Sequence, residues 1–173
     1  GGMTVLSSMT TSGNQTLSTT GGNLALDTVR AGGTGVVGLS TDTGSITDQN
    51  GVNANVFGQS LTASAATGIN VDTDIATLTA ATVTGTGDID VTETNGALLV
   101  VAATTTTGGN VLITVNNDDL TVRQVTAGGA GNVELATIGG GDIALGTAAG
   151  DLVTALGDQV TLRAAGAVSD GNG

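Results

Sequence analysis

The stretch GNVELATIGGGDIAL, residues 131–145, decides the fold. It contains one phrase twice: a glycine, a polar residue, and then apolar residues at alternate positions, Val133 with Leu135 and Ile143 with Leu145. Such alternation places the apolar side chains on one face of a β-strand and the polar ones on the other. Glycines ahead of each phrase supply the backbone freedom for a corner. The stretch therefore predicts short strands joined by tight corners.

The phrase recurs through most of the chain. Its copies begin, about 21 residues apart on average, at Gly22, Gly44, Gly68, Gly87, Gly109, Gly131, Gly150 and Gly166. A fixed period of 20–50 residues is typical of a solenoid. The sequence also has a longer repeat, because residues 24–39 match residues 120–135 at eight of sixteen positions. Gain or loss of whole units is expected of a stack whose members contact only their neighbours.

These repeats predict an all-β fold, a right-handed parallel β-helix of about 8 coils of roughly 21 residues. A lone unit cannot bury its apolar face, whereas stacked coils complete each other's hydrogen bonds about 4.8 Å apart. We expect one repeat segment over residues 1–173, with a weak or irregular first coil at 1–21 and regular coils at 22–173. An antiparallel β-sandwich is the main alternative. A helical fold is disfavoured by the many glycines and β-branched residues.

Composition and charge limit the partners. The chain has a net charge of −12, three arginines, one aromatic residue (Phe57), and no Cys, His or Lys. An acidic surface repels nucleic acid and anionic membranes. Disorder is the alternative for such a chain, but 39% hydrophobic residues at strand spacing argue against it. Absence of cysteine fits an exported protein. We see no signal peptide and no run of about 18 apolar residues, so we expect no membrane insertion by this segment.

At this point the chain resembles a known family. The phrases GSITDQNG, SLTASAATGINVDT, GDIDVTETNGALLV and VTLRAAGAVSDGNG are similar to the repeats of very large bacterial exoproteins of the filamentous-haemagglutinin type. The resemblance covers about residues 22–173. It implies a right-handed β-helical shaft, export across a Gram-negative outer membrane, and a role as stalk or adhesive fibre at the cell surface.

Calcium is the first candidate ligand. Closely spaced oxygen donors suit a hard cation, and the candidate ligands are Asp72, Asp74, Asp88, Asp90, Asp118 and Asp119. The nonapeptide pattern of calcium-binding β-helices fits residues 128–136 in its glycines but meets Val133 where aspartate is required. We therefore expect solvated corner residues and no resident metal or other cofactor.

The other two candidate functions are catalysis and, separately, recognition of ice or sugar by a threonine surface. With no His, Lys or Cys, a general base or nucleophilic triad of the usual kind cannot form, so we expect no enzyme. A flat threonine array for ice or sugar needs the same offset in every unit, and the offsets of Thr77, Thr82, Thr92 and Thr104 drift along the sequence. Phe57 is interpreted as a local core residue.

The sequence thus favours a segment of a longer extracellular shaft, built of stacked coils whose partners are neighbouring repeats of the same chain, with end-to-end or lateral self-association. The receptor is unknown. A self-assembling filament or matrix subunit is the second hypothesis, and an ice- or calcium-dependent binding module is the third.

Overall fold

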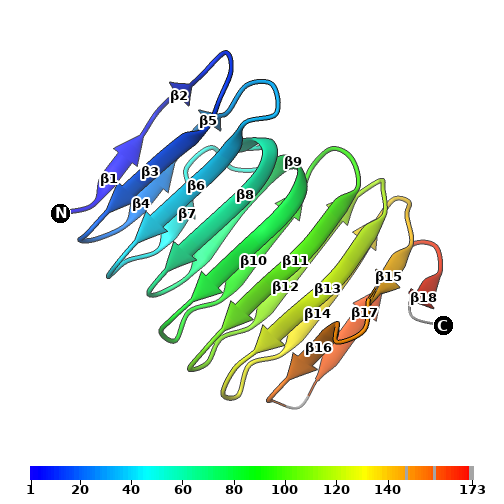
Figure 1. The fold of residues 1–173 in the computed structure, drawn as a ribbon. Coiled ribbons are helices and arrows are strands. Elements are labelled where there is room, and N and C mark those ends of the chain that lie inside the picture. The colour runs from blue at the N-terminus through cyan, green and yellow to red at the C-terminus, as the bar shows by residue number, and fades with distance from the viewer. Residues whose placement is uncertain (147, 158, 172–173) are drawn as a thin grey trace.

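The computed structural model describes residues 1–146, 148–157 and 159–171. Within these ranges the regular structure is all β, with no helix. Strands that are far apart in sequence lie side by side, and the chain advances coil by coil from β1 at one end of the stack to β18 at the other (Figure 1). Neighbouring coils pair in parallel throughout. The predicted parallel β-helix of about eight coils is confirmed.

Coils 1–4 contain β1 (Met3–Val5), β2 (Ser8–Met9), β3 (Gln15–Thr19), β4 (Leu24–Leu26), β5 (Val29–Arg30), β6 (Val36–Thr41), β7 (Ile46–Asp48), β8 (Val56–Ala65) and β9 (Ile69–Val83). Coils 5–8 contain β10 (Ile89–Glu93), β11 (Leu98–Thr105), β12 (Val111–Asn116), β13 (Leu120–Ala127), β14 (Val133–Ile138), β15 (Ile143–Leu145), β16 (Leu152–Ala155), β17 (Val160–Arg163) and β18 (Val168–Asp170).

The strand that opens each coil belongs to one continuous ladder. Its inward residues stack in the order Met3, Leu24, Ile46, Ile69, Ile89, Val111, Val133 and Val160. Successive partners are 21, 22, 23, 20, 22, 22 and 27 residues apart in sequence. From Leu24 to Val133 these side chains are at most 2% exposed. The alternation seen in the sequence therefore becomes a row of aliphatic side chains along the axis.

The two ends of the stack are open. Val160 and Val168 occupy inward positions but are 43% and 49% exposed. At the other end Met3 and Val5 are only partly buried. In the described part of the chain, the first and last coils have a neighbour on one side only, so their core residues and strand edges face solvent.

At most of the corners, the glycine before the phrase is required because neighbouring corners approach each other closely. A Cβ atom on Gly131 would collide with the carbonyl oxygen of Gly109, and one on Gly109 would collide with that of Gly87. Gly109 also has a positive φ of 116°, whereas Gly131 has no such conformation. Backbone freedom, the reason inferred from sequence, therefore explains only some of these corners.

Candidate functional site

The six aspartates considered for calcium come from two strands and two corners. Asp72 and Asp74 are on β9, Asp90 is on β10, Asp88 precedes β10, and Asp118 with Asp119 forms the turn after β12. Ile89 is fully buried between Asp88 and Asp90, as the alternation predicts. Among the described residues, no group of three or more His, Cys, Asp or Glu side chains is arranged to hold a metal ion.

Asp88 has a structural role at a corner. Its Oδ1 accepts a hydrogen bond from the backbone N–H of Asn110 in the next coil, at 2.6 Å. The Oδ1 atoms of Asn110 and Asn132 do the same for the N–H groups of Asn132 and Gln159, both at 3.0 Å. This row of side-chain oxygens satisfies backbone donors that would otherwise be unpaired at the corners. At a second corner, Asp119 Oδ1 accepts from the N–H of Asp142 at 2.8 Å.

Asp72 and Asp90 lie on the outer face of the first ladder, where several carboxylates come close. Burial raises the pKa of Asp72 above its ordinary value, and the charges of Asp48 and Asp90 act in the same direction. Burial also raises the pKa of Asp90, with a further contribution from Asp88. Mutual repulsion therefore adds to desolvation in raising the pKa of both carboxyl groups.

The most unusual acidic residue is Glu93, which the sequence analysis did not single out. It lies at the end of β10 and is 0% exposed. Its Oε2 accepts hydrogen bonds from Thr73 Oγ1 at 2.8 Å and from the N–H of Ile75 at 3.0 Å, and its Oε1 accepts from the N–H of Asn95 at 3.1 Å. A sequence signal existed, because Ile89, Val91 and Glu93 share the inward parity of one strand.

Phe57 is not a core residue, so the interpretation from sequence is wrong. Its neighbour Val56 faces inward and is fully buried, which turns Phe57 outward. Arg30, its ladder partner, lies over the ring with the guanidinium carbon 3.8 Å from the centroid. The aromatic ring is thus covered by a cation–π contact on the outer surface.

Hydroxyl side chains form a column that the drifting sequence offsets concealed. The register of neighbouring strands aligns seven outward residues, one from each of the first seven coils: Ser18, Ser40, Ser64, Thr82, Thr104, Thr126 and Thr154. Two residues earlier on the same strands, the outward residues are mixed: Thr16, Gly38, Thr62, Ala80, Ala102, Gln124 and Leu152. The hydroxyl groups therefore form a single row and not a two-dimensional array.

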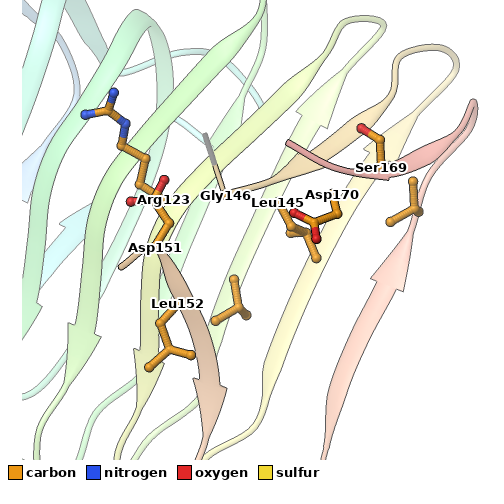
Figure 2. A pocket seen from close by; sticks show the side chains of 9 residues that line it. Arg123, Leu145, Gly146, Asp151, Leu152, Ser169 and Asp170 are labelled. Atoms are coloured by element: carbon orange, nitrogen blue, oxygen red, sulfur yellow. The ribbon is translucent and has the colours of Figure 1, made fainter. Parts of the chain in front are cut away.

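A hollow with a volume of about 440 Å³ lies near the C-terminal end of the described stack. Its lining residues lie on or next to β13, β15, β16 and β18, and the charged ones are Arg123, Asp151 and Asp170. Figure 2 shows Arg123, Asp151 and Asp170 around the hollow, and Asp170 is the ladder partner of Leu145. Because β18 forms one wall and has a paired strand on one side only among the described residues, the hollow belongs to the open end of the stack.

None of the described residues forms a helix that is long and apolar enough to cross a membrane. A scan against protein-family models, a search of curated proteins and a search of solved structures each found no match to this chain. Function must therefore be inferred from the stacked coils themselves.

Proposed function

We propose that this chain is a shaft segment of a giant secreted or surface-attached bacterial exoprotein of the filamentous-haemagglutinin type, acting extracellularly as an adhesin stalk. Its role is mechanical and not catalytic. The observation that supports this role is the unbroken ladder from Met3 to Val160, with fully buried aliphatic residues inside. Eight coils at about 4.8 Å each give a rod roughly 40 Å long. The family resemblance of the repeats supports the biological setting.

Two measured distances test whether the segment is a stiff spacer. Thr4, Thr47 and Thr161 occupy the same outward position of the first ladder. Thr161 lies seven coils from Thr4 and five coils from Thr47. The chain has no cysteine, so the double variants Thr4→Cys/Thr161→Cys and Thr47→Cys/Thr161→Cys accept spin labels only at the chosen sites.

Pulsed electron spin resonance should give two narrow distance distributions. At about 4.8 Å per coil, the backbone separations are about 34 Å and 24 Å, and the difference of about 10 Å is independent of the label arms. Broad overlapping distributions would contradict a stiff spacer. Labelling of native material by immunoelectron microscopy then tests the setting, because single molecules anchored at cells are expected of a stalk.

A self-assembling filament subunit is the second candidate function. The exposed inward residues Val160 and Val168 favour it, because among the described residues β17 and β18 have a paired strand on one side and a free strand edge is a template for pairing with another chain. Sedimentation at increasing protein concentration distinguishes the two. Particles that lengthen with concentration support the filament, and monomers at every concentration argue against it.

A further inference from the structure

The stack changes its cross-section between coils 4 and 5. In coils 1–4 a short sheet runs along one side, formed by β2, β5, the start of β8 (Val56–Gly58) and the middle of β9 (Thr73–Ile75). In coil 5, residues 94–97 form the turn between β10 and β11 instead of a strand of this sheet. Among the described residues, Asp74 and Ile75 consequently have a paired strand on the coil 3 side but not on the coil 5 side.

Side chains replace the missing strand at this edge. The Glu93 carboxylate accepts the hydrogen bond of the Ile75 N–H at 3.0 Å, a bond that a neighbouring backbone carbonyl would otherwise accept. The same carboxylate accepts from the Asn95 N–H, so it joins β9 of coil 4 to the turn of coil 5. Thr94 completes the edge, since its N–H and its Oγ1 both donate to the carbonyl of Thr73 at 2.8 Å.

The charges around Glu93 do not compensate a buried anion. Strands β8, β11 and β12 and the turn 94–97 contain no titratable residue. Asp90 on β10 faces outward, and Asp74 on β9 adds a like charge. The ion pair between Arg163 and Glu134 lies on the surface and does not involve Glu93. Burial, with a smaller contribution from the charge of Asp74, raises the pKa of Glu93 to about 7 against the effect of its three hydrogen bonds.

We propose that Glu93 makes the boundary between coils 4 and 5 a pH-responsive joint in the rod. In mild acid the protonated side chain closes the edge of the short sheet. Above neutrality the ionised side chain is stabilised when it is hydrated, so local opening of the joint becomes more frequent while the flanking coils stay closed. The inference depends on the fold and on Glu93, and does not require that the rod be an adhesin stalk.

Hydrogen exchange followed by NMR tests the joint directly. The amides of Ile75 and Asn95 report on it because both donate to Glu93. If the carboxyl titrates near 7 when closed and near its ordinary value of 4.5 when open, linkage predicts that protection factors at these amides fall about 30-fold between pH 5.5 and pH 8.5. The amide of Ile113, which lies in coil 6, serves as the internal reference and should not show this fall.

The variant Glu93→Gln should abolish the pH dependence at the two amides, and Glu134→Gln, a change of the same kind on the surface, should preserve it. An unchanged ratio between joint and reference amides in the wild-type protein would overturn the proposal. So would an equal fall in Glu93→Gln. If that variant does not fold, a carbon-13 titration of Glu93 in the wild-type protein decides, since a midpoint below pH 5 also overturns the joint.

Discussion

Replacing Gly131 by alanine should destabilise the stack through a backbone collision. The new Cβ would overlap the carbonyl oxygen of Gly109 and lie 3.0 Å from that of Gly128. Both obstacles are main-chain atoms, so relief requires the corners of two coils to separate. Such overpacking costs about 1–3 kcal/mol. Relief of the contact with the Gly128 carbonyl also weakens the hydrogen bond that this carbonyl accepts from the Gly131 N–H, worth about 1 kcal/mol. We therefore expect a loss of about 2–4 kcal/mol.

Gly38→Ala is the matched control for this prediction. Gly38 lies within β6, its φ is not in the left-handed region, and the nearest atom to an added Cβ is Thr16 Oγ1 at 3.5 Å. An alanine that fits should stabilise the protein by about 0.4–1 kcal/mol, because it restricts the unfolded chain.

Urea unfolding followed by far-ultraviolet circular dichroism measures both variants, since the chain has no tryptophan or tyrosine for fluorescence. The m-values of the variants and of the wild-type protein must agree for the comparison to hold. A Gly131→Ala protein within about 0.5 kcal/mol of the wild type would refute the close-approach explanation. An equal loss in Gly38→Ala would refute it as well, because glycine content and not corner geometry would then be responsible.

Three further predictions concern the core, the corners and pH. Ile113→Ala, at a fully buried ladder position, should cost about 2–5 kcal/mol in urea unfolding, whereas Ile138→Ala, at a side chain that is 56% exposed, should cost much less. Asp88→Ala should lower stability because the Asn110 N–H loses its acceptor, Asp88→Asn should restore most of it, and neither thermal midpoint should respond to calcium or a chelator. Because the pKa of Glu93 is raised from 4.5 to about 7, its contribution to the free energy of unfolding is fully present below pH 4.5 and is lost as the pH rises through 7. This loss is at most about 3 kcal/mol. The free energy of unfolding of Glu93→Gln, measured across the same pH range, should not show it.

The fold was predictable because its signals are local and repeated. Alternation at Val133 and Leu135 fixes which side chains face inward, and repetition of the phrase fixes what each strand stacks upon. The spacing near 22 residues follows from the same copies. The estimate of about 21 was lowered because the copies at Gly150 and Gly166 precede β16 and β18, which do not belong to the first ladder.

The candidate sites were less predictable, because strand parity and register have to be known residue by residue. Phe57 was misassigned since an isolated aromatic residue suggests a core, whereas its position after the buried Val56 turns it outward. The hydroxyl column was missed because turns of different length shift Ser64 and Thr82 in sequence but not in space. Glu93 was missed for a different reason: its inward parity was visible, but the hydrogen-bond donors that make burial tolerable come from the preceding coil.

The buried polar side chains show where a stack of this kind is able to change shape. Asn55, Thr73 and Glu93 are each 0% exposed and come from three successive coils around the same corner. Asn55 Oδ1 accepts from the Asp72 N–H at 3.1 Å, and Glu93 accepts from that of Ile75, so side chains on both sides of coil 4 satisfy its corner backbone. Within a regular ladder, neighbouring strands pair by backbone hydrogen bonds, and side chains such as Asp88 and Asn110 satisfy backbone donors at the corners. Two different cross-sections joined in one rod need such side chains at the boundary as well. Thr41, Thr105 and Thr137 are also buried but lie away from this corner, whereas Glu93 is the ionisable member of the buried polar set among the described residues. The pH-responsive joint that we propose therefore falls at the boundary between the two kinds of coil.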